Sequence, residues 1–144
     1  MKKTIARNAL LAASLLVTPI SCVHAQQDST ISDKEISVLD FHELGYPPLA
    51  LQTRTQGVVV VRTRLDNEGK VVEAVAISGS ELLIPASVAN AKKWQFQPNA
   101  RRVAVIVYNF RLSYAAKCKS TGSFFTLEAP NFATIIDCAR TIAD

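Results

Sequence analysis

The stretch that decides the fold lies in the middle of the chain. Residues 57–78 read GVVVVRTRLDNEGKVVEAVAIS, and residues 83–98 read LIPASVANAKKWQFQP. The first stretch predicts two β-strands, because β-branched residues flank a DNEG turn in which Gly69 can adopt a positive φ. The second predicts a helix that Pro85 opens and that ends near Trp94. Its predicted core face consists of Ala86, Val88, Ala91 and Trp94. We therefore expect a sheet packed against a helix.

A third strand and a short first helix complete this unit. Residues 103–112 place large apolar side chains at every second position, which predicts the longest strand. Residues 46–52 predict a short helix, because its prolines suit a first turn, and Gly57 ends that segment. Trp94 is predicted to be a core anchor between helix and sheet, and Phe96 to be a structural residue that, with Pro98, turns the chain outward. The predicted fold class is therefore α+β, with a small antiparallel three-stranded sheet packed against one helix in the order α-β-β-α-β.

Residues 114–144 predict a C-terminal extension with a hairpin of its own. Residues 124–127 and 133–137 suit two short strands joined by an Ala-Pro-Asn turn. Cys118 and Cys138 are positioned to tie off this hairpin, and two cysteines in an exported protein favour a disulfide over a metal site. We expect the hairpin to lie against the exposed edge of the sheet.

The first 25 residues predict a secretory signal peptide. Lys2, Lys3 and Arg7 precede a short apolar run, and the segment ends in the small residue Ala25. The apolar run is well short of the roughly 20 residues that a helix needs to span a bilayer. Two alternatives to cleavage stay open: a lipid anchor on Cys22, and retention of the leader as an inner-membrane anchor.

Charge and side-chain chemistry argue against several classes of function. Without the basic leader the formal net charge of the chain decreases from +4 to about +1. A charge this close to neutral does not indicate nucleic acid as a partner. His42 is the one histidine beyond the leader, and no triad, phosphate loop or metal-ligand pattern can be assembled. The turn between two strands accounts for the neighbouring carboxylates of Asp66 and Glu68 without any acid–base role. We therefore predict no enzyme activity, no cofactor, no metal and no small-molecule substrate.

The pattern from residue 46 to residue 112 resembles the C-terminal domain of the TonB energy-transducer family. The matching features are Tyr46-Pro47, Gly57 with strand 58–65, turn 66–69, the Ser-Gly-Ser break 78–80, Leu83, the Trp-Gln-Phe-Gln-Pro segment 94–98 and strand 105–112. The predicted organisation is a signal peptide at 1–25, a polar lead-in at 26–45, a TonB C-terminal-like domain at 46–113 and the extension at 114–144.

The resemblance implies a periplasmic module that binds an extended peptide segment of an envelope or outer-membrane protein. Unpaired N–H and C=O groups at a sheet edge accept such a segment as an added strand. By position, this edge is the third strand. The implied binding residues are Val103, Val105, Val107, Asn109, Arg111, Tyr46 and Pro47. Gly45 stands where the family motif has a glutamine before the tyrosine.

Two departures from the family pattern shape the expected function. A transducer needs a membrane helix and a long proline-rich stretch, and the sequence suggests neither. We therefore expect a free-standing exported domain, linked to TonB-dependent transport, that keeps the fold without energy coupling. The alternative hypothesis is a structural or assembly protein of the cell envelope, in which the tail seals the sheet or pairs with a second copy to give a dimer.

Overall fold

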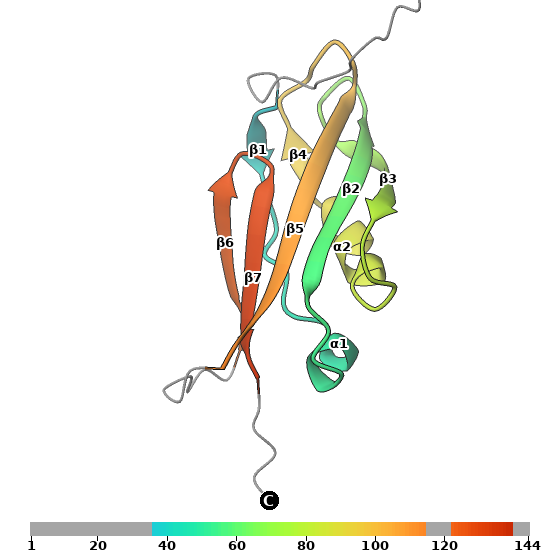
Figure 1. The fold of residues 1–144 in the computed structure, drawn as a ribbon. Coiled ribbons are helices and arrows are strands. Elements are labelled where there is room, and N and C mark those ends of the chain that lie inside the picture. Colours follow the sequence, from blue (N-terminus) through green and yellow to red (C-terminus); the bar gives the residue numbers. More distant parts are fainter. Residues whose placement is uncertain (1–35, 115–121, 140–144) are drawn as a thin grey trace, which may run out of the picture. The chain divides into compact units, whose positions relative to one another are not determined.

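Five strands form one mixed sheet in the computed structural model, which describes residues 36–114 and 122–139 (Figure 1). They are β2 (Gly57–Leu65), β3 (Val71–Ser78), β5 (Val103–Ser113), β6 (Phe124–Ala129) and β7 (Phe132–Cys138). The order across the sheet is β3-β2-β5-β7-β6; β7 runs parallel to β5, and the other neighbours are antiparallel. The predicted α+β class is confirmed, whereas the predicted three-stranded sheet is wrong.

The sheet is larger than predicted because the C-terminal hairpin joins it. The β5–β7 ladder runs from the pair Val107–Phe132 to the pair Ser113–Cys138. β7 also contributes the fully buried side chains of Ala133 and Ile135 to the core. Burying this apolar surface is favourable, so the hairpin is part of the domain rather than an attachment to it.

The remaining elements lie with the core on one face of the five-stranded sheet (Figure 1). They are α1 (Pro48–Gln52), α2 (Ile84–Ala91) and a two-stranded sheet formed by β1 (Val38–Asp40) and β4 (Gln95–Phe96). α2 packs on β2 and β3, and Pro85 lies in its first turn as predicted. Both predicted helices are therefore present.

The face of α2 that meets the core agrees only in part with the prediction, in which Ala91 and Trp94 are correct. Its buried residues are Ser87, Asn90 and Ala91, whereas the expected core residues Ala86 and Val88 are only half-buried. Two polar side chains can lie in the core because both are hydrogen-bonded. Ser87 Oγ donates to the carbonyl oxygen one turn earlier at 2.9 Å, and Asn90 has several partners that are described below.

Residues 36–45 belong to the folded unit, contrary to the expectation of a polar lead-in that extends to residue 45. Ile36 is only 5% exposed, and β1 pairs with β4. The ring of Phe41 stacks on Phe125 and tilts against Trp94, with 5.8 Å between centroids in both cases. A few apolar side chains are thus enough to attach an otherwise polar segment to the core.

The turn between β2 and β3 requires glycine at Gly69 for two reasons. Its φ is +82°, and a Cβ atom there would lie 1.8 Å from the carbonyl oxygen of Phe96. β4 therefore passes close to the turn only because no side chain intervenes. Gly57, with a φ of +140°, starts β2, and Trp94 and Phe96 are both fully buried in the core.

Several predictions concern residues outside the described ranges. They are the leader at 1–25, the alternative lipid site at Cys22, and Cys118. Cys138 is disulfide-bonded, but its partner lies outside the described residues, so the pairing with Cys118 stays a prediction. Among the described residues, no helix has the length and apolar character needed to cross a membrane.

Candidate protein-binding surfaces

The strand that was expected to form the open edge, β5, lies in the middle of the sheet. β2 pairs with one side of it, and β7 lies along the other side beside Val107, Asn109 and Arg111. Of the predicted binding residues on β5, only Val103 and Val105 have no paired residue on β7. The prediction that β5 is the edge strand is therefore wrong, because the chain's own hairpin already supplies an added strand.

Tyr46 and Pro47 lie at the start of α1, where Tyr46 is buried. The Tyr46 hydroxyl donates to the carbonyl oxygen of Thr55 at 2.6 Å, and its ring meets Phe110 edge to face at 5.4 Å. Its backbone N–H donates to Ser123 Oγ at 2.7 Å. Burial raises the pKa of Tyr46 to about 12. Tyr46 thus connects the first helix to the hairpin instead of facing a partner.

The base of the hairpin is held by a small hydrogen-bond network. Ser123 Oγ donates to Asp137 Oδ2 at 2.7 Å, and Asp137 Oδ1 accepts the N–H of Cys138 at 2.6 Å. Hydrogen bonds to a carboxylate are stronger than those between neutral groups. This network fixes the start of β6 against the end of β7.

Backbone hydrogen bonds show which residues of the hairpin face outward. The N–H of Val107 donates to the carbonyl of Asn131, and the N–H of Ala139 donates to the carbonyl of Ser113. The odd-numbered residues of β7 therefore bond to β5, and the even-numbered ones face β6. Because Thr126 of β6 pairs with Thr134, its N–H and C=O groups face β7. The N–H and C=O groups of its two neighbours, Phe125 and Leu127, therefore point away from the sheet.

Among the described residues, the sheet ends in two strands that are paired on one side only, β3 and β6. On β6, the outward backbone groups belong to Phe125 and Leu127, and the neighbouring Phe124 side chain is 60% exposed. On β3, the Val75 side chain is 50% exposed and Ile77 is also exposed. Unpaired N–H and C=O groups at either edge can accept an added strand.

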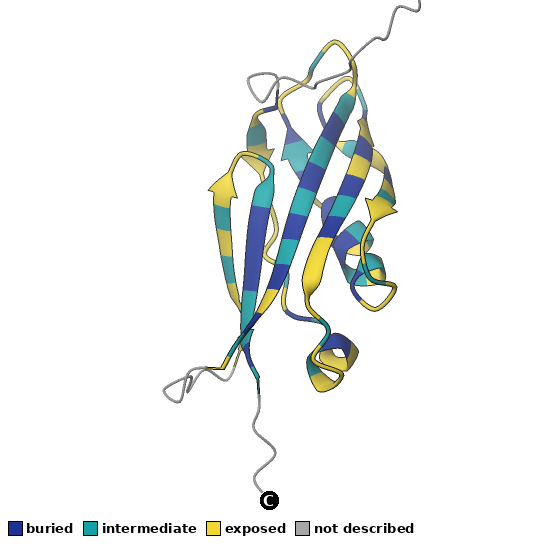
Figure 2. Ribbon diagram, viewed as in Figure 1, coloured by how far each residue is buried: buried dark blue, intermediate teal, exposed yellow. Residues whose placement is uncertain are grey.

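The sheet face that α2 does not cover is also largely apolar. Along β5 its residues are half-buried while those on the other face are buried, an alternation that Figure 2 shows. Its most exposed apolar side chains include those of Phe124, Ile77, Val75 and Val58. The open face of an antiparallel sheet is commonly polar, and exposed apolar area of this kind is typical of contact surfaces.

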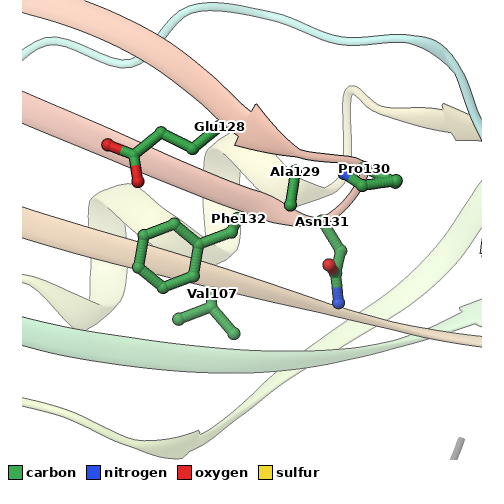
Figure 3. Close-up of a pocket in the computed structure, with 6 residues that line it drawn as sticks. All are labelled: Val107, Glu128, Ala129, Pro130, Asn131 and Phe132. Carbon is green, nitrogen blue, oxygen red and sulfur yellow. The ribbon is translucent and has the colours of Figure 1, made fainter. Parts of the chain in front are cut away.

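A recess opens beside the turn between β6 and β7 (Figure 3). Its volume is about 600 Å³, and its lining residues are Val107, Glu128, Ala129, Pro130, Asn131 and Phe132. We call it the turn recess. In Figure 3 the Phe132 ring lies between the Val107 side chain and the Glu128 carboxylate. The turn recess therefore combines an apolar surface with one acidic group.

The residues considered as catalytic candidates have structural roles. Asp66 Oδ1 accepts the backbone N–H groups of Glu68 and Lys70 at 2.8 and 2.9 Å, and Lys70 Nζ pairs with the Glu68 carboxylate at 2.8 Å. His42 is exposed, and its carbonyl oxygen accepts a hydrogen bond from Asn90 Nδ2 at 3.0 Å. In the part of the chain that the structure describes, no group of His, Cys, Asp and Glu residues could hold a metal ion.

Asn90, which the sequence did not single out, is the centre of a buried polar network. Its Oδ1 accepts hydrogen bonds from Trp94 Nε1 at 2.8 Å and from the Tyr108 hydroxyl at 2.9 Å. Its Nδ2 donates to the carbonyls of His42 and Glu43. Burial raises the pKa of Tyr108. The one local signal for this role is that Asn90 precedes Trp94 by one helical turn.

Comparison with known proteins gives one family. Residues 42–114 match the family model described as Gram-negative bacterial TonB protein C-terminal. No match was found among curated proteins or among solved structures. The matched range ends just after β5, so β6, β7 and nearly all of the turn recess lie outside it.

Proposed function

Because the chain belongs to the TonB C-terminal family, we propose that it is a periplasmic module that holds an extended segment of an envelope or outer-membrane protein by strand addition. Proteins of this family are associated with the cell envelope and act as energy-transduction and binding modules. The observation that carries the proposal is the open edge of β6. It offers backbone donors and acceptors beside exposed apolar side chains.

The hairpin moves the open edge by two strands, from β5 to β6. A partner that approaches this side of the sheet meets the outward backbone groups of Phe125 and Leu127 first, with Phe124 exposed beside them. β6 contains no proline or lysine, and these are common means of protecting an edge strand. Its one register shift lies at the far end, between Leu127 and Ala129.

β3 is the rival edge and is better protected. Its pairing with β2 shifts register near both ends, and Glu73 on β3 forms an ion pair with Arg64 on β2 at 2.9 Å. Each edge strand carries one glutamate, but bulges disfavour the addition of another strand, and β3 has two register shifts where β6 has one. We therefore place the partner on β6.

Site-specific photo-crosslinking in the periplasm tests this placement. A photoreactive phenylalanine analogue is introduced at Phe124 on β6 or at Val75 on β3, which have similar exposed fractions of 60% and 50%. We expect a discrete adduct with an envelope protein from position 124 and none from position 75. The proposal would be refuted if only position 75 gave an adduct, or if neither position did.

Two matched proline variants show whether backbone pairing is responsible. Leu127→Pro removes an outward N–H from β6, and Ala76→Pro removes one from β3; proline is tolerated at such edge positions. Leu127→Pro should abolish the position-124 adduct while Ala76→Pro leaves it unchanged, with folding of both checked by circular dichroism. Slower amide hydrogen exchange at Phe125 and Leu127 in the crosslinked complex provides a test without proline.

A structural role in the envelope is the second candidate function. It is favoured by the hairpin's occupation of β5, the edge that the family resemblance implies for binding. In that case β6 would pair with a second copy or with a static envelope component. A stable dimer by light scattering, together with a position-124 adduct of twice the protein's own mass, would support this alternative over capture of a different partner.

A further inference from the structure

The sheet is interrupted beside Val105, next to the turn recess. The ladder between β5 and β7 starts at Val107, because the chain turns away at Pro130 and Asn131. The outward backbone groups of β5 alternate, so those of Val105 face the same side as those of Val107. On one side Val105 pairs with Arg62 of β2; on its other side, within residues 36–114 and 122–139, the ladder to β7 does not reach it.

The neighbouring position, Val103, differs because a side chain takes the place of a strand. Asn99 Nδ2 donates to the carbonyl oxygen of Val103 at 3.0 Å, and Asn99 Oδ1 accepts its N–H at 3.3 Å. The interruption is therefore confined to Val105. It is bounded by the Asn99 side chain on one side and by the hairpin turn at Asn131 on the other.

The charge of the turn recess selects the kind of side chain that it accepts. Glu128 is its one charged lining residue. In the described part of the chain the ion pairs are Arg64–Glu73 and Lys70–Glu68, so the Glu128 carboxylate has no cationic partner. A carboxylate beside exposed apolar surface attracts a lysine or arginine, whose apolar stem can cover the Phe132 ring.

From these observations we infer that the turn recess is a second contact site. It receives an extended peptide segment that pairs with Val105 through its backbone and places a basic side chain against Glu128 and Phe132. All lining residues but Val107 lie outside the family match, so the site belongs to this chain's extension. The inference rests on the proposed role in protein binding but not on the use of β6.

Titration with two synthetic peptides tests the site. Both are end-blocked heptapeptides of alternating valine and threonine, with either a lysine or a glutamate in the centre. Nuclear magnetic resonance of the purified protein would follow the Val105 backbone amide and the Asn131 side-chain amide. We expect both signals to shift with the lysine peptide, and the glutamate peptide to bind about fivefold more weakly, in line with a partly exposed ion pair.

Variants separate the contributions of charge and backbone. Glu128→Gln should remove the preference for lysine, whereas the control Glu81→Gln, another exposed glutamate, should leave it unchanged. Val105→Pro removes the outward N–H and should abolish the shift of the remaining reporter, the Asn131 side-chain amide, without changing the far-ultraviolet spectrum. Equal affinity for the two peptides, or a lysine preference that survives Glu128→Gln, would overturn the inference.

The two proposals fail in different ways. If the turn recess does not bind the peptides while position 124 still crosslinks to an envelope protein, this inference is wrong and the function proposed for β6 stands. If the lysine peptide binds while position 124 gives no adduct, the turn recess is the contact site and the placement on β6 is wrong.

Discussion

Replacement of Asn90 by leucine tests whether one buried amide holds three parts of the fold together. The Asn90 side chain bonds to Trp94 at the end of α2, to Tyr108 on β5, and to the carbonyls of His42 and Glu43 in the segment before α1. Leucine fills a similar volume but has no polar atoms. The indole N–H of Trp94 and the hydroxyl of Tyr108 would then remain buried without their acceptor.

The expected loss of stability follows from the burial of these groups. Trp94 and Tyr108 are fully buried, and Asn90 itself is only 4% exposed. A buried donor left without a partner costs about 1–3 kcal/mol, while the carbonyls of the exposed residues His42 and Glu43 can bind water instead. We expect Asn90→Leu to lower the free energy of unfolding by about 3 kcal/mol, which corresponds to roughly 10–20 °C in Tm for a domain of this size.

Two control variants separate the effect of the Asn90 hydrogen bonds on stability from the effect of its side-chain volume. Tyr108→Phe removes one donor and leaves Asn90 Oδ1 bonded to Trp94, so a loss of about 1 kcal/mol is expected. Asn90→Asp keeps the acceptor but turns the second polar atom into an oxygen that faces two carbonyls. Burial should raise the pKa of that carboxyl above its unfolded value, so the Asp variant should become more stable as pH falls from 7 to 4.

Urea and thermal unfolding, followed by circular dichroism at both pH values, measure these effects. A loss below about 1 kcal/mol for Asn90→Leu would refute the reasoning, because the two buried donors would then have found other partners. The same conclusion would follow if the Asp variant were equally stable at pH 4 and pH 7.

Three further predictions concern stability. Gly69→Ala should lower the free energy of unfolding by more than about 3 kcal/mol or prevent folding, because its Cβ atom would lie 1.8 Å from a carbonyl oxygen. The control Gly45→Ala, whose Cβ atom would lie 3.8 Å from its nearest neighbour, should lower it by less than about 1 kcal/mol in urea unfolding. Thr134→Val should stabilise the protein by about 1 kcal/mol, because the buried Thr134 hydroxyl has no hydrogen-bond partner among the described residues. Thr63→Val removes a 3.0 Å hydrogen bond and should destabilise the protein by a similar amount; changes of the same sign in thermal unfolding would contradict this. The raised pKa of Tyr46 means that the unfolded chain loses this proton first, so stability should fall between about pH 10 and 12, and Tyr46→Phe should weaken that dependence in alkaline denaturation.

The elements that the sequence predicted correctly are those with local signals. The β-branched runs of β2 and β3, the turn at Gly69 and the proline that opens α2 each constrain the backbone through neighbouring residues. The alternation along β5 was also read correctly as a strand. The alternation indicates which side chains of β5 are buried. It would be the same whether β5 paired with one neighbouring strand or with two. The position of β5 within the sheet therefore could not be derived from it.

The polar network could not be predicted for a related reason. A hydrophobic pattern assigned Ala86 and Val88 to the core face of α2 and gave no role to Asn90. Burial of Asn90 is favourable only because Tyr108 and the carbonyl of His42 lie next to it, and these residues are far away in the sequence. The attachment of residues 36–45 was missed in the same way, since its contacts, such as those of Phe41 with Phe125 and of β1 with β4, join segments that are far apart in the sequence.

The pairing of β7 with β5 limits where a partner can bind. An external strand that replaced β7 would have to compensate for the ladder from Val107 to Ser113 and for exposure of the buried Ile135 side chain, which alone costs about 1.5–3 kcal/mol. It would also compete with a segment of the same chain, whose pairing with β5 is intramolecular. The disulfide at Cys138 restrains that segment further. A peptide of micromolar affinity, worth about 8 kcal/mol, would lose much of its binding energy in this exchange, whereas binding at β6 or at the turn recess displaces none of the described strands. If the proposed function holds, we therefore expect the hairpin to direct binding to its own outer edge and its turn.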